Sequence, residues 1–425
     1  MTTPVRELDR RHVWHPYTQH FDAPAPSVVT RAEGAYLYDD GGRRIFDAIS
    51  SWWVTLHGHA HPVIAAAVGR QACTLEQVLF AGFTHEPAVR LAAALSGVLP
   101  PGLTRVFYSD DGSTAVEVAL KMALQFWTGR GERRPLIAAL EHAYHGDTFG
   151  AMAVSARGLF TAPFAGHLFE VARLPDPSAE EGGAATIAAL DRVLDTRGRE
   201  LAAVIVEPLL LGAGGMRMWD ASVLRAIRER TAAVGVLLIA DEVLTGFGRT
   251  GPTFACARAD VAPDIMCLSK GITGGFLPLG ATVAREEIFA GFSSPDRRRT
   301  LFHGHSYTAN PLACAAALAS LSLLDDASAR ARESIERAHK AGLARLSSHP
   351  RVSRCRVLGT VAAFDLDAEP GYLSAIGPEL AAYALRAGVL LRPLGNVVYL
   401  LPPYCSTAED LEHAYDVIEG FLESQ

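Results

Sequence analysis

Long hydrophobic segments, runs of basic residues and paired cysteines are all scarce in this chain of 425 residues. No segment reaches the roughly 18 uninterrupted apolar residues that a transmembrane helix needs, and the N-terminal segment lacks the apolar stretch typical of a signal peptide. The formal net charge is -7, and the basic cluster that stands out, Arg297–Arg299, follows Asp296. A membrane span and a nucleic-acid partner are therefore disfavoured.

The six cysteines are scattered along the chain and form no C-x-x-C pair. In a chain of this length that pattern is typical of free thiols in a reducing compartment, so we expect a cytoplasmic protein in which most cysteines are small core residues. Histidines recur at i, i+2 spacing within 57–61 and 303–305, but neither group has carboxylates or cysteines at ligand spacing nearby. We therefore predict no metal site.

Between residues 104 and 285, short apolar runs alternate with helical patterns. The runs are continuously apolar, as expected for strands of a parallel sheet that is covered on both faces. This order predicts an α/β layered domain whose ligands gather at the carboxyl ends of the strands. The predicted strands are 104–109, 136–140, 202–206, 236–241, 265–268 and 279–284, and the clearest helices are 114–127 and 222–233.

The remainder of the chain has different patterns. After a long helical connection over 313–349, strands are predicted within 352–367 and 389–401, and helices near 379–387 and over 408–422. That mixture indicates a small α+β domain. The first 60 residues are rich in aromatic residues, glycine and proline, so we expect an irregular segment there. The predicted division is an N-terminal segment (1–60) that packs with the small domain and lines the site, a large ligand-binding domain (61–315) and a small C-terminal domain (316–425).

Two charged residues end apolar strands in the middle of the chain. Asp241 ends the run VGVLLIAD, and Lys270 ends the run PDIMCLSK before a glycine-rich turn, 270 − 241 = 29 residues later. Burying an ammonium is costly unless it pairs or reacts. A lysine amine condenses with aldehydes and moves protons, and a pyridine ring accepts electrons well when a facing carboxylate keeps its nitrogen protonated. Together, Lys270 and Asp241 predict amino transfer with pyridoxal 5′-phosphate (PLP).

A candidate phosphate cradle lies between the strand 104–109 and the following helix, which is predicted to begin at Thr114. Thr114 and Glu117 fit a capping box, and the free N–H groups and dipole of a helix N-terminus attract a dianion. In the segment HAYHGDTFG, the ring of Tyr144 is placed to lie flat on a cofactor, with Asp147 orienting it.

The segment 246–251 matches the dinucleotide-binding pattern G-x-G-x-x-G. It follows a predicted strand, but Pro252 comes next and another strand begins only about a dozen residues later, so the helix of a roughly 30-residue dinucleotide unit does not fit. We therefore reject a dinucleotide site.

Four segments together resemble the class III (omega) aminotransferases, and the resemblance covers nearly the whole chain. It implies an α/β protein of the fold-type I PLP-dependent transferases, with a large, mainly parallel-sheet domain of seven strands and a small α+β C-terminal domain. It also implies a homodimer whose active sites lie at the interface. The segments are YHGDTFGAMAVS (144–155), ADEVLTGFGRTG (240–251), LSKGITGGFLPLGA (268–281) and HGHSYTANPLACAAALASL (303–321).

A narrower resemblance points to the branch of that family that acts in biotin synthesis. It implies transfer of an amino group from S-adenosylmethionine to 8-amino-7-oxononanoate (KAPA), giving 7,8-diaminononanoate. One departure is that many members have Pro-Thr after the His303-Gly304 pair, whereas this chain has His305-Ser306, which keeps the hydroxyl. The segments that carry the resemblance are HVWHPYTQ (12–19), SSWWVTLHGHAHP (50–62), EPLLLGAGGMRMW (207–219) and LRPLGNVVYLLPPY (391–404).

The resemblance also implies roles for individual residues. Lys270 would hold PLP as a Schiff base, Asp241 would face the pyridine nitrogen, and Tyr144 would stack on the ring. The phosphate and cofactor would also contact Gly112, Ser113, His305 and Ser306, and Gly304 and Ser306 would come from the neighbouring subunit. The substrates would contact Tyr17, Trp52, Trp53, Asp147, Arg249, Gly304 and Arg392, and Arg392 would take the KAPA carboxylate through its guanidinium fork.

Other readings of these residues stay open. One is a class III aminotransferase that acts on another pair, such as an omega-amino acid and pyruvate, although the tryptophan pair argues against it. A second keeps KAPA as the acceptor and uses lysine as the donor. An isomerase that shifts an amine within one substrate shares all the cofactor residues. A last alternative is a PLP-binding regulator without catalysis. Such a protein is expected to carry an appended DNA-binding domain, and the N-terminal 60 residues show no helix-turn-helix pattern.

Overall fold

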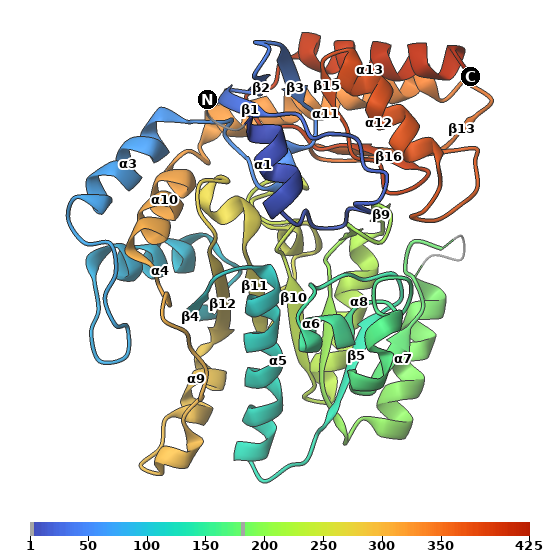
Figure 1. Cartoon of the computed structure of the whole chain (residues 1–425). Helices are drawn as coiled ribbons and strands as arrows, with labels where there is room; N and C mark the ends of the chain where they lie inside the picture. Colours follow the sequence, from blue (N-terminus) through green and yellow to red (C-terminus); the bar gives the residue numbers. More distant parts are fainter. Residues whose placement is uncertain (1–3, 180–182) are drawn as a thin grey trace.

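A seven-stranded sheet forms the centre of the molecule. The computed structural model describes residues 4–179 and 183–425. The strand order is β4-β12-β11-β10-β7-β5-β6 (Figure 1), and all neighbours are parallel except at β12, which runs antiparallel to β11 and β4. The prediction of an α/β, mainly parallel sheet is confirmed, although β6 was missed. The strands are β4 (Leu103–Ser109), β5 (Leu136–Leu140), β6 (Val171–Leu174), β7 (Leu201–Val206), β10 (Leu237–Asp241), β11 (Ile265–Leu268) and β12 (Gly280–Arg285).

The continuous apolar runs are explained by hydrophobic packing on both faces of this sheet. Every residue of β5, β7, β10 and β11 is buried. Successive residues belong to different clusters: Ile239 packs with α5 (Gly112–Gly129), whereas Leu238 packs on the other face with residues of α8 (Ala221–Ala233). Because side chains alternate along a strand, a sheet covered by helices on both faces needs apolar residues at every position.

The C-terminal part of the chain forms a second layer with its own sheet, β13-β14-β16. The long helix predicted over 313–349 is two helices, α10 (Pro311–Ser322) and α11 (Asp326–Leu346), which are bent by 74°. The break follows from capping, because the side chain of Asp325 accepts a hydrogen bond from the Ser328 amide and starts a new helix. The other elements are β13 (Val352–Leu358), β14 (Val361–Leu366), α12 (Ile376–Arg386), β15 (Val389–Leu390), β16 (Val397–Leu400) and α13 (Ala408–Glu423).

The N-terminal segment is more regular than expected. After α1 (Val5–His12), residues 13–28 have no regular element, but strands β1, β2 and β3 then form a sheet with β15 from the C-terminal part. Figure 1 shows these blue strands beside the orange and red C-terminal elements, above the large sheet. The expectation of an irregular segment is therefore wrong for residues 29–47. The strands are β1 (Val29–Glu33), β2 (Tyr36–Asp39) and β3 (Arg44–Asp47).

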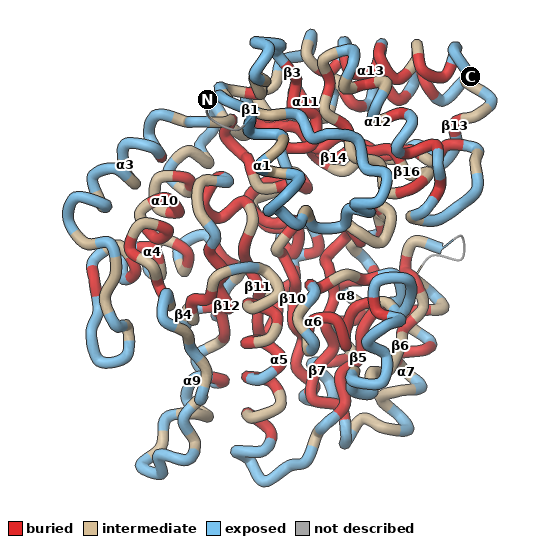
Figure 2. The backbone as a smooth tube through the Cα atoms, viewed as in Figure 1, coloured by how far each residue is buried: buried red, intermediate tan, exposed pale blue. Residues whose placement is uncertain are grey.

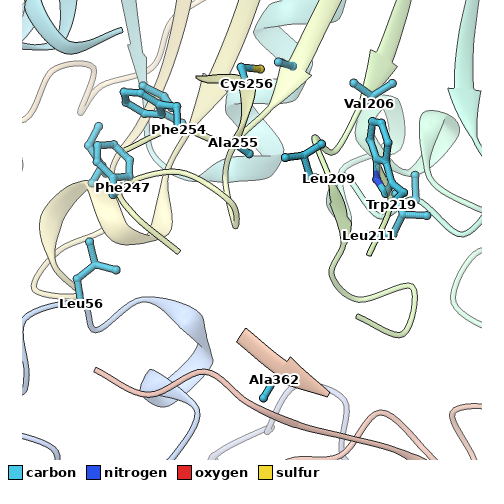
Figure 3. Close-up of a cluster of buried hydrophobic side chains, with 14 of the residues drawn as sticks. Leu56, Val206, Leu209, Leu211, Trp219, Phe247, Phe254, Ala255, Cys256 and Ala362 are labelled. Carbon is cyan, nitrogen blue, oxygen red and sulfur yellow. The ribbon is translucent and has the colours of Figure 1, made fainter. Parts of the chain in front are cut away.

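Buried residues run through both parts of the molecule, whereas residues 13–28 and the outer face of α3 are largely exposed (Figure 2). Figure 3 shows the core near the carboxyl ends of the large sheet, where the rings of Phe247 and Phe254 pack edge to face, 5.5 Å apart. The remaining elements are α2 (Ser50–Trp53), α3 (Pro62–Ala72), α4 (Glu86–Val98), α6 (Phe149–Val154), η1 (Ala162–His167), α7 (Ala184–Arg197), β8 (Leu210–Leu211), β9 (Arg217–Met218), η2 (Ala255–Ala259), η3 (Lys270–Thr273), α9 (Glu286–Phe292) and η4 (Arg297–Arg299).

Among the described residues no single helix is long and apolar enough to cross a membrane. The bent pair α10–α11 has the length and composition of a membrane span only when its two helices are taken together, and α10 packs against α3, α4 and η3. Within residues 4–179 and 183–425, no three His, Cys, Asp or Glu side chains converge as metal ligands. The segment 246–251 forms turns and a bend after β10, and the next element is the short helix η2.

Candidate active site

A cavity of about 690 Å³ lies at the carboxyl ends of the large sheet. Its polar walls come from the residues directly after five strands, because the parallel strands β5, β7, β10 and β11 end at one edge and β4 points the same way. This is the edge at which ligands of open α/β sheets bind. The residues that follow these strands and line the cavity include Asp110 and Asp111 after β4, Tyr144 after β5, Glu207 after β7, Asp241 at the end of β10, and Ser269 and Lys270 after β11.

Lys270 is held in a strained backbone conformation at the start of η3. Its φ of 45° lies in the left-handed region, which is uncommon for residues other than glycine. Its Nζ lies 4.6 Å from the centroid of the Trp53 ring, and no carboxylate in the described part of the chain forms an ion pair with it. Burial lowers the pKa of Lys270 to about 8, although the charges of Asp241 and Glu207 act in the opposite direction. The amine is therefore a usable nucleophile near neutral pH.

Asp241 is buried and fixed from two sides. One oxygen, Oδ2, lies 2.6 Å from Nδ1 of His145, and Oδ1 accepts a hydrogen bond from the Val243 amide at 3.1 Å. Its side chain is 4% exposed and that of His145 is fully buried. A charge-assisted hydrogen bond of this kind orients a carboxylate toward the cavity. His145 was not singled out in the sequence.

The N-terminus of α5 faces the same cavity. The helix begins at Gly112, and its N-cap is Asp111, whose carboxylate accepts a hydrogen bond from the Thr114 amide at 2.8 Å while the Thr114 hydroxyl accepts from the Asp111 amide at 3.0 Å. The predicted capping box of Thr114 with Glu117 is therefore wrong. Glu117 instead accepts hydrogen bonds from the amides of the following α6 segment, at 2.7 and 3.1 Å.

The loop after β5 packs directly against this helix end. Gly146 has a φ of 130°, and a Cβ at this position would lie 2.2 Å from Ser113 Oγ, so only glycine permits the approach. The Ser113 hydroxyl is within hydrogen-bond distance of Thr148, 2.7 Å from its hydroxyl and 3.0 Å from its amide. This contact brings the loop that carries Tyr144 to the helix end that carries Gly112 and Ser113.

A second cavity, of about 330 Å³, adjoins the first. Trp53, Tyr144, Asp147 and Lys270 line both, so the two spaces meet at the lysine. The second cavity is largely aromatic, which suits a substrate with a long apolar chain. Its other walls are Pro16, Tyr17, Trp52, Phe160, Ala213, Tyr372, Arg392, Leu394 and Tyr399.

Arg392 supplies the positive charge of this second cavity. Its guanidinium carbon lies 4.6 Å from the centroid of the Trp52 ring, which is within the range of a cation–π contact. Among the described residues no carboxylate lies within ion-pair distance of Arg392, so the alternative of an internal salt bridge is not seen. Tyr17 completes this wall: its hydroxyl donates to Asp147 and lies 3.5 Å from the Tyr144 hydroxyl.

Four predicted site residues do not line either cavity of this chain. Arg249 is fully buried behind the site, donates to the carbonyl of Pro402 at 2.8 Å, and has its pKa lowered to about 10 by burial. Gly304 and Ser306 are exposed, and His305 lies 3.4 Å from Asp110 at the rim of the first cavity. The structure thus brings together the other ten predicted residues, namely Tyr17, Trp52, Trp53, Gly112, Ser113, Tyr144, Asp147, Asp241, Lys270 and Arg392.

Glu207 is the main residue that the sequence reasoning missed. It is 5% exposed, and its carboxylate accepts hydrogen bonds from the amides of Tyr144 at 2.8 Å and Gly212 at 3.0 Å. Burial raises its pKa to about 7. The signal was present, because Glu207 directly follows an apolar strand as Lys270 does. Phe160 and Tyr372, whose rings lie 4.8 Å apart, had no such signal.

The chemical groups that line the first cavity match those that PLP needs. It has a half-buried amine for an aldehyde, a fixed carboxylate for a ring nitrogen, and a helix N-terminus for a dianion. Its volume also lies in the roughly 300–1,000 Å³ range of small-molecule sites.

Comparisons with known proteins point the same way. The model of the family "Aminotransferase class-III" matches residues 17–422. Two enzymes named adenosylmethionine-8-amino-7-oxononanoate aminotransferase, from Synechococcus elongatus and Corynebacterium glutamicum, are 54% and 38% identical to this chain. The match to the Synechococcus enzyme covers 97% of this chain and 98% of that enzyme, and the match to the Corynebacterium enzyme covers 95% of each.

Two solved structures share the fold. The enzyme of the same name from Methanocaldococcus jannaschii superimposes with a TM-score of 0.92 at 32% identity, covering 98% of each chain. A PLP-bound amine transaminase from an uncultivated Pseudomonas species gives a TM-score of 0.90 at 32% identity, covering 97% of this chain and 98% of its own. The chain therefore belongs to the class III aminotransferase family and is a PLP-dependent aminotransferase.

Proposed function

We propose that this enzyme transfers the amino group of S-adenosylmethionine to KAPA, giving 7,8-diaminononanoate, a step of biotin biosynthesis. The observation that carries the proposal is the position of Arg392, unpaired by any described carboxylate, in an aromatic cavity that meets the cofactor cavity at Lys270. KAPA combines a carbonyl, a long apolar chain and a terminal carboxylate. A carboxylate fits the guanidinium fork, and the chain fits aromatic walls.

The same walls suit the proposed donor. The rings of Tyr17 and Trp52 lie 5.7 Å apart, and those of Tyr17 and Phe160 lie 5.6 Å apart, in each case edge to face. S-adenosylmethionine carries an adenine ring, which stacks on aromatic side chains, and a sulfonium cation, which is attracted to aromatic faces. One set of aromatic walls can thus receive either substrate in turn.

When bound, PLP supplies the aldehyde that takes up an amino group and a pyridine ring that accepts electrons. In our proposal Lys270 Nζ would hold the cofactor, and as a free amine it would carry a proton to or from the substrate. Asp241, oriented by His145, would favour the protonated form of the ring nitrogen. Gly112 and Ser113 would hold the phosphate, and Tyr144, whose amide donates to Glu207, would contact the ring.

We also propose that the enzyme is a homodimer with shared active sites. Gly304, His305 and Ser306 carry donors for a phosphate or substrate but lie outside the cavities of their own chain, so a second copy has to present them. Exposed apolar side chains nearby, Phe302 (72% exposed) and Tyr307 (62% exposed), suit a protein interface. Dilution to monomer should release PLP; a monomer that keeps full occupancy contradicts the shared site. A reducing, cytoplasmic location fits the six free cysteines.

The function is tested by single half-reactions followed through the absorbance of bound PLP. S-adenosylmethionine, lysine and glutamate are offered separately, and only the true donor converts the aldehyde form of the cofactor to the amine form. The amine form is then mixed with KAPA, pyruvate or 2-oxoglutarate. Conversion by S-adenosylmethionine and reversal by KAPA are expected. Conversion by lysine alone would assign the alternative donor, and reversal only by pyruvate or 2-oxoglutarate would assign another class III aminotransferase.

A further inference from the structure

The two tryptophans of the site are presented by a strained turn. In the segment Ser50–Trp53, the φ angles of Ser50, Ser51 and Trp53 are 53°, 59° and 67°. Ser51 has a ψ of -92°, which lies outside the left-handed well that other residues sometimes adopt. A cluster of such conformations persists only where surrounding contacts impose it, and it is typical of functional sites.

Asp47 provides those contacts from the N–H side of the turn. Its Oδ2 accepts hydrogen bonds from the Ser51 amide at 2.6 Å and the Ser51 hydroxyl at 3.3 Å, and its Oδ1 accepts from the Ile49 amide at 3.3 Å. The carboxylate is completely buried, and His59 Nε2 lies 2.8 Å from Oδ2. Donors therefore surround both oxygens.

Arg249 holds the same turn from its carbonyl side. Its Nη2 lies 3.3 Å from the Thr55 carbonyl oxygen and 3.5 Å from that of Trp53. The turn is thus fixed by a buried carboxylate at its amides and by a buried guanidinium at its carbonyls. Neither group lines a cavity, so neither is placed to touch a substrate.

The turn determines where both aromatic walls lie. Trp52 points to the second cavity, against Arg392 and Tyr17. Trp53 points to the lysine, and its Nε1 donates to the Tyr399 hydroxyl at 2.9 Å. A relaxed turn would move both rings together, because Trp52 and Trp53 are consecutive residues.

We propose that Asp47, supported by His59, is a positioning residue that imposes the strained turn and thereby sets the distance between the substrate walls and Lys270. The proposal rests on the proposed roles of Trp52 and Arg392 in binding substrates. It is independent of which amine is the donor. The competing interpretation is that Asp47 and His59 form an ordinary internal pair whose loss only lowers stability.

A glycine substitution in the turn separates the positioning role of Asp47 from a purely stabilising one. Asp47→Asn keeps the size of the side chain and removes its charge, so the holoenzyme should keep PLP on Lys270. Its KM for both substrates should rise roughly ten- to hundredfold, as expected when hydrogen bonds to a buried charge are lost. Ser51→Gly removes the backbone strain, since glycine adopts positive φ freely. Added to Asp47→Asn, it should recover about tenfold of the loss.

Ser51→Ala is the matched control, because it removes the same hydroxyl and leaves the strain. The combination Asp47→Asn with Ser51→Ala should recover nothing. The proposal would be overturned if the low KM returned in both combinations or in neither of them. An Asp47→Asn enzyme with an unchanged KM would also overturn it. Constants are measured with whichever amine converts the cofactor, so failure of the S-adenosylmethionine assignment does not affect this outcome.

A second readout does not depend on turnover. Trp53 lies against the residue that binds PLP, so energy transfer from tryptophan to the cofactor should fall in Asp47→Asn and return with Ser51→Gly but not with Ser51→Ala. If Asp47→Asn fails to fold, His59→Gln takes its place, because it leaves the carboxylate and removes only its support. A smaller KM increase, again reversed by Ser51→Gly alone, is then expected; an increase that glycine leaves unchanged would contradict the positioning role.

Discussion

Lys270, Asp241 and Glu207 follow or end three strands of one sheet, whereas Tyr17 and Trp52 come from the N-terminal segment and Arg392 from the C-terminal part of the chain. The first group forms the cofactor side of the site and the second forms its substrate side. On the cofactor side one edge of the sheet places all three groups, and burial shifts the pKa values of Lys270 and Glu207. On the substrate side the aromatic rings are partly exposed, with Trp52 at 40% and Tyr17 at 42%, and a strained turn and a short sheet place them.

This difference has a chemical consequence. Burial makes the desolvation of charge large on the cofactor side, so the pKa values of the Lys270 amine and the Glu207 carboxyl are both shifted toward neutral pH. On the substrate side, partly exposed aromatic side chains provide the walls that two different substrates would contact. Four predictions test whether the two sides are as separate as the geometry indicates.

The largest effect is expected from the cofactor side. Lys270→Ala removes the nucleophile and the proton carrier together, so turnover should fall by at least about 10⁴-fold. Because Gly112, Ser113 and Asp241 remain, PLP should still bind without a covalent bond. Borohydride reduction of the unchanged enzyme followed by peptide mapping should label Lys270. Label on another lysine would remove the basis of the assignment.

Asp241→Asn should give the next largest loss. The amide keeps the size of the side chain but not its charge, so the pyridine nitrogen loses the partner that keeps it protonated. PLP should still attach to Lys270, while proton removal from the substrate slows by about 10²–10³-fold, as for other preorganised electrostatic groups. Rapid-mixing measurement of one half-reaction checks this. Near-normal half-reactions would mean that Asp241 has a purely structural role.

The same difference explains what the sequence revealed. A continuous apolar run that ends in a charged residue is a local pattern, so the strands and Lys270 and Asp241 were predicted, each matched strand within one residue at either end. Glu207 has the same pattern, because it directly follows the apolar strand β7, so the sequence also offered a local signal for it. The contact of Phe160 with Tyr372, the clamp on the Ser50–Trp53 turn and the burial of Arg249 depend on tertiary packing between distant segments. No local spacing encodes them.

On the substrate side, Arg392→Ala should separate the two half-reactions. Removing the guanidinium should weaken KAPA by roughly 2–4 kcal/mol through the lost charged pair, or about 30- to 1,000-fold in KM. The half-reaction with S-adenosylmethionine should change much less. Trp52→Ala is the comparison variant: it opens a wall shared by both substrates and should damage both halves. Equal damage to both halves by Arg392→Ala would instead indicate a structural arginine.

The smallest effect concerns stability, and its sign should differ between Glu207 on the cofactor side and His339 in the C-terminal part. Burial lowers the pKa of His339, which packs against Tyr415 and the Thr360 carbonyl in the C-terminal part, to about 4. Since the folded-state pKa lies below the unfolded value of about 6.5, its contribution to stability is complete above that value and is lost as the pH falls toward 4. Glu207 behaves oppositely: its folded pKa of about 7 lies above the unfolded value, so its contribution is complete below pH 4.5 and is lost as the pH rises through 7.

Between pH 7 and pH 5, each group should therefore change the free energy of unfolding by about 2 kcal/mol, in opposite directions. In the cofactor-free protein, His339→Gln should make acid less destabilising, and Glu207→Gln should make it more so. Urea unfolding of each variant at the two pH values measures both changes. His413→Gln, at an exposed position, is the control for the loss of a histidine side chain. Variants at His339 and Glu207 that shift the pH dependence in the same direction would contradict the opposite effects of burial on these two groups.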